Sequence, residues 1–179
     1  MTEATKDEAG LLQAARHLAS RADIALRIGF RVERLSLEET EGIVCNWKQA
    51  RSSVGDDEKL LHYGFAFVLA GTIFDQRQSG PMSDELHKQV TADMSHAYEA
   101  REAVVEWGLA PDLEKTNPFA RTGYKLASRF LHHDSALIEQ LADALLAKKT
   151  MSEDELKAWF AEHAEPLPLE EIEQSVLYE

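Results

Sequence analysis

His17-Leu18-Ala19-Ser20-Arg21-Ala22 is the stretch of this chain that decides the fold. It lies in a segment, residues 8–28, whose apolar residues recur at the spacing of one helix face: Leu11, Ala15, Leu18, Ala22 and Ala25. We therefore expect a helix that ends at Gly29. His17 and Arg21 lie one turn apart on it, at the flank of the apolar face. Taken alone, the pair predicts a His and an Arg at the surface edge of a helix.

The same stretch has the spacing of a zinc-protease motif without its chemistry. In His-Glu-x-x-His, two imidazoles one helical turn apart bind a single zinc ion, and the Glu activates the metal-bound water. Here His17 matches the first His, whereas Leu18 stands at the Glu position and Arg21 at the second His position. A guanidinium stays protonated and offers no lone pair to a metal. This helix therefore supplies one zinc ligand at most.

The rest of the chain predicts a mainly α fold with a small N-terminal β-hairpin. Alternation over residues 30–37 and the run over 43–47 indicate the two strands. Further helices are expected over residues 58–76, 83–107 with Ser83 as N-cap, 119–149 with a break near His132-His133-Asp134, and from Ser152, which forms a capping box with Glu155. Residues 51–57 and 110–118 are expected to be loops. Residues 1–7 and 169–179 are expected to be tails, the second with room for one short helix.

Composition limits the class of protein. A chain of 179 residues with 44% hydrophobic residues suits one domain with a real core, so we expect a single domain over residues 1–179. The net charge of −13 opposes binding to nucleic acids and to anionic membrane surfaces. Cys45 is the single cysteine, which fits a reducing compartment. Neither a signal peptide nor an apolar run of 18 residues is present, so we expect a cytoplasmic protein.

Asp93 is the second candidate for a metal-binding or catalytic residue. It falls on the apolar stripe of the helix expected over residues 83–107, which runs Leu86, Val90, Asp93, Ala97 and Val104. A carboxylate on such a stripe is costly unless it is paired or bound to a metal. Asp93 is therefore a metal ligand or catalytic acid, or else it lies at the edge of the stripe beside Met94 and forms a salt bridge. His96, three residues later, could serve as a substitute ligand.

Taken in order, these segments resemble the peptidase domain of the FtsH-type ATP-dependent zinc metalloproteases. His17 to Ala22 stands where that family has His-Glu-Ala-Gly-His-Ala. Residues 29–37 are similar to the family's strand after the metal-binding helix, and residues 65–74 are similar to its next long helix. Residues 91–94 are similar to the segment that holds the third zinc ligand, an Asp, and residues 105–109 are similar to a Glu-Trp-Gly-Met helix ending. The family's closing helices are similar to residues 141–146, 149–151 and 155–156. The likeness spans about residues 10–163.

The resemblance implies that His17 and Asp93 stand at two of three zinc-ligand positions. Arg21 holds the third, and Leu18 holds the position of the general base. Without a carboxylate to accept the proton of water, we expect no catalytic residue and no hydrolysis by the family's mechanism. Two ligands make a zinc site doubtful, so no cofactor is expected. The chain also has no G-x-x-x-x-G-K-[ST] loop for ATP.

We expect instead that Arg21 occupies the place of the metal and forms an ion pair with Asp93, with His17 alongside. This favours a catalytically inactive peptidase-like domain with a binding, adaptor or regulatory role, an unknown protein partner, and a monomeric or small homo-oligomeric state. Two alternatives stay open. One is an active zinc metallopeptidase with a rearranged site, such as His17, Asp93 and His96. The other is an unrelated helical regulatory protein whose likeness is accidental.

Overall fold

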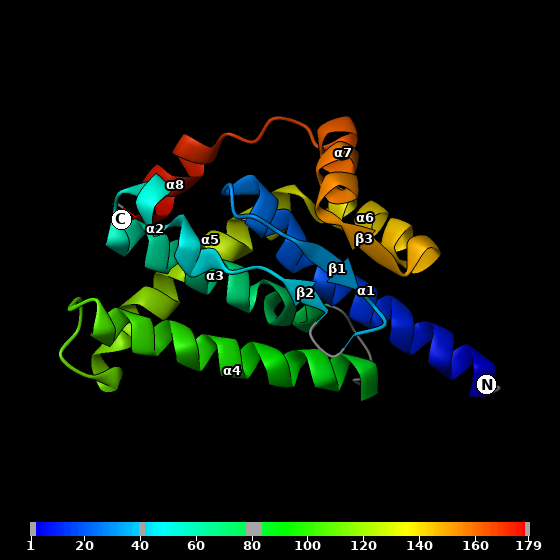
Figure 1. The fold of residues 1–179 in the computed structure, drawn as a ribbon, viewed down its shortest axis with the longest axis horizontal. Helices are drawn as coiled ribbons and strands as arrows, with labels where there is room; N and C mark the ends of the chain where they lie inside the picture. The colour runs from blue at the N-terminus through cyan, green and yellow to red at the C-terminus, as the bar shows by residue number, and fades with distance from the viewer. Residues whose placement is uncertain (1–2, 40–41, 78–83, 178–179) are drawn as a thin grey trace.

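The structure is a computed structural model that describes residues 3–39, 42–77 and 84–177 (Figure 1). It is mainly α-helical with a small antiparallel sheet, as the sequence predicts. The α-helices are α1 (Glu3–Arg27), α2 (Arg51–Val54), α3 (Asp57–Gln76), α4 (Asp84–Glu106), α5 (Asn117–His133), α6 (Ser135–Lys148), α7 (Glu153–His163) and α8 (Leu169–Leu177). The strands are β1 (Arg34–Ser36), β2 (Ile43–Val44) and β3 (Thr150–Ser152), and the 3₁₀-helices are η1 (Trp47–Ala50) and η2 (Leu113–Thr116).

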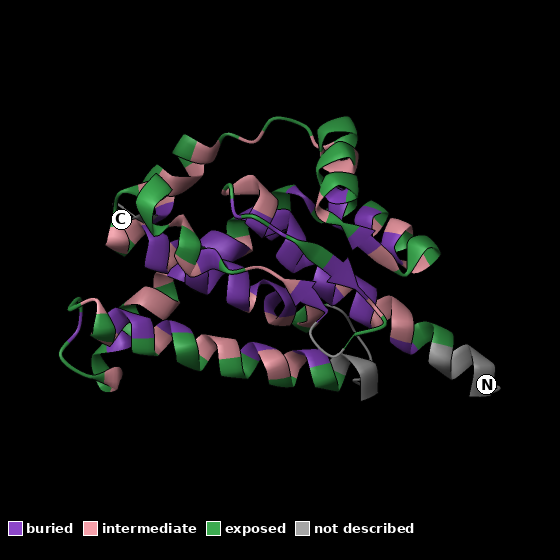
Figure 2. Cartoon of the chain, viewed as in Figure 1, coloured by how far each residue is buried: buried purple, intermediate pink, exposed green. Residues whose placement is uncertain are grey.

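Helix α3 is the centre of the molecule. It is apolar around most of its circumference, and such a helix must be enclosed by its neighbours. Helices α1, α4 and α5 pack around it, and Figure 2 shows the buried residues concentrated along α3 and the facing side of α1. The helix begins where the sequence places it, because the Asp56 carboxylate accepts a 3.0 Å hydrogen bond from the Lys59 amide.

Helix α1 is enclosed on more sides than its sequence indicates. Its apolar face packs on α3 and α6, and α4 also lies against it. As a result the flank that was expected at the surface edge is inside the molecule: His17 and Arg21 are buried, as are Ser20 and Asp23. Leu18 is fully buried in the same core. The helix ends at the predicted place, where Gly29 takes a φ of +80°.

The sheet differs from the expected hairpin. β1 and β2 pair antiparallel but are shorter than predicted, and the chain from Trp47 folds into η1 instead of extending the strand. β3, which was not predicted, pairs with the other side of β1, so the order is β2-β1-β3 and β2 is an edge strand. β3 escaped prediction because a three-residue strand is too short to show alternation. Its central residue Met151 is nevertheless fully buried.

The expected tails and loops also carry structure. α1 already begins at Glu3, and α2 and η2 lie in the two segments expected to be loops. α8 packs against α5, with Val176 buried and Glu173 2.8 Å from the Lys59 ammonium, so the segment from residue 169 is part of the packed fold. The predicted break at Asp134 and the Ser152–Glu155 capping box are confirmed. The predicted N-cap Ser83 lies outside the described residues.

Among the described helices, none is long and apolar enough to cross a membrane.

A buried carboxyl pair joins α1 to the corner between α5 and α6. Arg27 donates hydrogen bonds of 2.8 and 2.9 Å to the two carboxylate oxygens of Asp134, and its Nε lies 3.8 Å from Asp23 Oδ1. Within the described part of the chain, neither oxygen of the fully buried Asp23 has a hydrogen-bond donor. Burial and then the charge of Asp134 raise the pKa of Asp23 well above 3.8, although Arg27 opposes the shift.

Replacing Asp23 with Asn is expected to remove a loss of stability at high pH. Because the folded state keeps the Asp23 proton above pH 3.8, the contribution of this group is fully present below that pH and is lost as the pH rises through the raised pKa. Asp23→Asn stays neutral throughout, so we expect it to gain about 1–2 kcal/mol at pH 8 and little at pH 4. Urea unfolding over this range measures the difference. Exposed Asp143 on α6 supplies the control Asp143→Asn; equal pH profiles for both variants would contradict the prediction.

Candidate functional site

Four charged side chains from three helices meet beside the centre of α3. His17 and Arg21 come from α1, Asp75 from the last turn of α3, and Asp93 from α4. The side chains of His17, Arg21 and Asp93 are at most 3% exposed, and that of Asp75 is 12% exposed. Charges held this far from water must be compensated within the protein.

Arg21 and Asp93 form the centre of the cluster. Arg21 Nη1 lies 2.6 Å from Asp93 Oδ1, so the structure brings together the two residues that the sequence analysis expected to pair. Asp93 does not lie at the edge of its helix stripe, because it is buried whereas its neighbour Met94 is 71% exposed. The Arg21 guanidinium also lies over the ring of Phe67, 4.5 Å from its centroid. This cation–π contact adds to the attraction between Arg21 and Asp93.

His17 lies between two carboxylates. Its Nδ1 is 2.7 Å from Asp75 Oδ2, and its Nε2 is 3.1 Å from Asp93 Oδ2. Burial alone would lower the pKa of His17, but the hydrogen bonds and charges of Asp75 and Asp93 outweigh it and raise the pKa. An imidazolium ring carries a proton on both nitrogens, so it can face both acceptors at once.

The cluster is balanced in charge. Arg21 stays protonated although burial lowers its pKa, because Asp93 opposes the shift and a guanidinium is too basic to titrate. Burial raises the pKa of Asp75, and His17 opposes it. The raised pKa of His17 favours its protonated form, and in that form two monocations face two carboxylates and together carry the charge of one Zn²⁺. Three polar atoms of the cluster, His17 Nε2, Arg21 Nε and Asp93 Oδ1, make no aligned hydrogen bond in the described residues.

These residues do not fit a zinc ion. The Arg21 guanidinium contacts Asp93 where a metal would need the carboxylate, and it offers no lone pair. His96, the candidate substitute ligand, lies with its Nδ1 3.4 Å from Arg21 Nη2. Across the described ranges, no group of three or more His, Cys, Asp or Glu side chains is arranged to hold a metal. Leu18, at the general-base position, is an apolar core residue.

Two members of the site were missed from the sequence. Asp75 could have been found, because it is an isolated carboxylate in the last turn of the apolar run over residues 58–76. Phe67 could not, since nothing distinguishes it from the other aromatic residues of the same helix. The distance in sequence from His17 to Asp75 is 58 residues, so only the packing of α1 on α3 shows that they meet.

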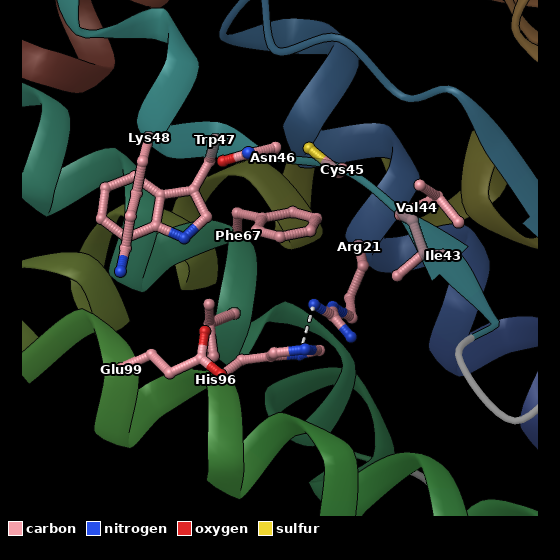
Figure 3. A pocket seen from close by; sticks show the side chains of 11 residues that line it. Arg21, Ile43, Val44, Cys45, Asn46, Trp47, Lys48, Phe67, His96 and Glu99 are labelled. Atoms are coloured by element: carbon pink, nitrogen blue, oxygen red, sulfur yellow. Dashed lines mark hydrogen bonds between the residues drawn. The ribbon is translucent and has the colours of Figure 1, made fainter.

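A cavity of about 400 Å³ opens next to Arg21 (Figure 3). One wall is formed by the edge strand β2 and by the chain that follows it, up to Lys48. The opposite wall is α4 with His96 and Glu99, and Figure 3 shows Arg21 and the ring of Phe67 between the two walls. The volume falls within the range of small-ligand sites.

Neither comparison of this chain with known proteins identifies a relative. Its sequence matches no protein-family model, and a search of curated proteins finds no match either.

Proposed function

We propose that this chain is a catalytically inactive FtsH-peptidase-like domain that acts as a binding, adaptor or regulatory protein. We place it in the cytoplasm, as a single domain with a protein partner and as a monomer or small homo-oligomer. Nucleic acid is not among the partners we propose, because the net charge of −13 opposes it.

One observation carries this proposal: Arg21 Nη1 lies 2.6 Å from Asp93 Oδ1, with His17 beside the same carboxylate. In the family that the sequence resembles, the corresponding three positions bind zinc. A guanidinium and an imidazolium can replace the dication without leaving either carboxylate uncompensated. The convergence of three residues from two distant segments, at the positions that the resemblance assigns, also favours common ancestry over accidental likeness.

Two features support a role other than hydrolysis. The general-base position holds Leu18, which is buried in the core and carries no group that accepts a proton. The charged cluster nevertheless borders the cavity beside β2, where a ligand can reach the protein. A pocket next to a site that lacks the reacting groups is suited to binding.

The test is to return one ligand to the site. In Arg21→His, His17 and Asp93 are available together with a second imidazole, and Asp75 already holds His17 Nδ1 in the way an outer carboxylate orients a zinc-bound histidine. We expect about one zinc per chain in this variant and less than about a tenth of that in the wild type and in Arg21→Met. Elemental analysis after dialysis against zinc measures both.

The outcomes separate the alternatives. Stoichiometric zinc in the wild type, with cleavage of casein that a chelator stops, would establish the active peptidase in place of our proposal. A folded Arg21→His that binds no zinc would contradict the zinc-site ancestry and favour an unrelated helical protein. Asp93→Asn in the Arg21→His background serves as the control, because it removes the anionic ligand and should abolish zinc binding.

A further inference from the structure

The outer face of α5 carries a row of positive charge in an acidic protein. Arg121, Lys125 and Arg129 follow one another at four-residue spacing, and all three are exposed. Residues four apart lie on one face of a helix, with about 6 Å between their Cβ atoms, so these three cations form the basic row of α5. Residues 117–133 contain no Asp or Glu, although the whole chain has 32 of them and a net charge of −13.

The basic row has no counter-charge within the described part of the chain. No carboxylate there forms an ion pair with any of its three side chains. The carboxylates on the elements around it are engaged elsewhere: Asp134, at the end of α5, binds Arg27, and Glu173 on α8 lies 2.8 Å from the Lys59 ammonium. Like charges four residues apart on a helix repel each other, so the row costs the protein stability while nothing covers it.

A fourth cation reaches the row from α3. Arg77, the C-cap residue of α3, donates a 3.1 Å hydrogen bond from Nη2 to the carbonyl oxygen of Ser128. This contact places the exposed Arg77 guanidinium beside the turn of α5 that carries Lys125 and Arg129. The positive charge is therefore denser at this end of the row.

A hollow of about 210 Å³ borders the row where α8 packs beside α5 (Figure 1). It is lined by residues of both helices: Tyr124, Lys125, Ser128, Arg129, Ser175 and Val176. The exposed carboxylates Glu170 and Glu171 lie in the first turn of α8 and are not among the lining residues. Pockets for whole small ligands measure roughly 300 Å³ or more, so this hollow is suited to a single side chain of a larger partner.

We propose that the outer face of α5 binds a short acidic segment of a protein partner. Carboxylates placed over the basic row relieve the repulsion between its cations and form exposed ion pairs with them. An apolar side chain between those carboxylates fills the hollow beside Tyr124, which is 46% exposed. Charge complementarity thus defines the occupant as acidic, and the hollow adds one apolar anchor.

The length of the row favours a short segment over a long polyanion. Eight residues of helix span about 12 Å, which matches about four residues of an extended chain. A nucleic acid or an anionic membrane would extend past the row over a protein with a net charge of −13 and would be repelled there. The inference goes beyond the proposed function, because α5 contributes no residue to the cluster of His17, Arg21, Asp75 and Asp93.

Calorimetric titration of the full chain with three probes tests the chemistry of the partner. The probes are acetyl-Glu-Glu-Leu-Glu-Glu-amide, the same peptide with Gln in place of each Glu, and a short oligothymidylate. We expect saturable binding of the Glu peptide and at least about tenfold weaker binding of the Gln peptide. The affinity for the Glu peptide should fall when the salt concentration rises from about 10 to about 150 mM. Oligothymidylate binding as tightly as the Glu peptide would overturn the inference in favour of a nucleic-acid surface.

A triple variant of the basic row tests the place of binding: Arg121→Gln, Lys125→Gln and Arg129→Gln. It should keep its fold, because the three side chains are exposed and their mutual repulsion is removed; thermal unfolding followed by circular dichroism checks this. We expect it to bind the Glu peptide about tenfold more weakly than the wild type, since three exposed ion pairs contribute about a factor of two each.

A matched triple variant removes the same number of positive charges from exposed sites outside α5: Lys88→Gln, Lys148→Gln and Lys157→Gln. At about 150 mM salt, where distant charges are screened, it should bind within about twofold of the wild type. Equal losses in the two triple variants, or no saturable binding of the Glu peptide to the wild type, would overturn the inference. Neither result bears on the zinc experiment, which tests the ancestry of the buried cluster separately.

Discussion

Asp93→Ala is expected to lower the free energy of unfolding by about 3–5 kcal/mol, because it leaves buried charges without their partner. Asp93 faces Arg21 at 2.6 Å and His17 at 3.1 Å, and all three side chains are at most 3% exposed. Chemical denaturation of the wild type and the variant at pH 7 measures the change.

The matched control removes the opposite charge as well. Arg21→Met keeps a long apolar side chain over Phe67, and the Arg21→Met/Asp93→Ala double variant has no unpaired guanidinium. We expect the double variant to be more stable than the sum of the two single changes predicts, by about 2 kcal/mol or more. Lys148→Ala, which breaks an exposed ion pair with Glu155, should have a small effect by comparison. Additive single changes at Arg21 and Asp93 would show that the pair is not coupled.

The same cluster shows how much of the fold and of the site can be predicted from the sequence. The helices and their ends were predictable because periodicity, capping residues and glycines are local signals; Gly108, for example, follows α4 with a φ of +76°. The meeting of Arg21 and Asp93 could be expected only through the resemblance, since no local pattern links residues on two helices. The raised pKa of His17 could not be predicted from the sequence, because it depends on Asp75. Asp75 lies beside His17 only through the packing of α1 on α3.

Several of the features that were missed depend on contacts between distant segments. β3 pairs with β1 across more than a hundred residues, so nothing near Thr150 indicates its partner. Trp47 was expected in a strand, yet its indole packs against α3 where Gly64 leaves room for it. The cavity likewise forms only when the chain after β2 lies opposite α4.

Gly71→Ala is expected to destabilise the protein by about 2–3 kcal/mol, although alanine is the better helix former by about 1 kcal/mol. A Cβ on Gly71 would lie 2.4 to 2.6 Å from three atoms of the His17 ring. The ring cannot withdraw, because it is fully buried and is held between Asp75 and Asp93. Gly71 is therefore the residue that lets the imidazole reach both carboxylates.

His17→Ala provides the background that isolates this contact. With the ring removed, the Cβ added at residue 71 meets none of these three atoms, so Gly71→Ala should cost little or become slightly stabilising there. Denaturation of the two single variants and the double variant gives the coupling energy, expected to be about 2 kcal/mol or more. The close approach of α3 to the imidazole would be rejected as the cause if Gly71→Ala were equally costly in both backgrounds. Strong coupling would show that the His17 ring occupies the space beside Gly71 in the folded protein.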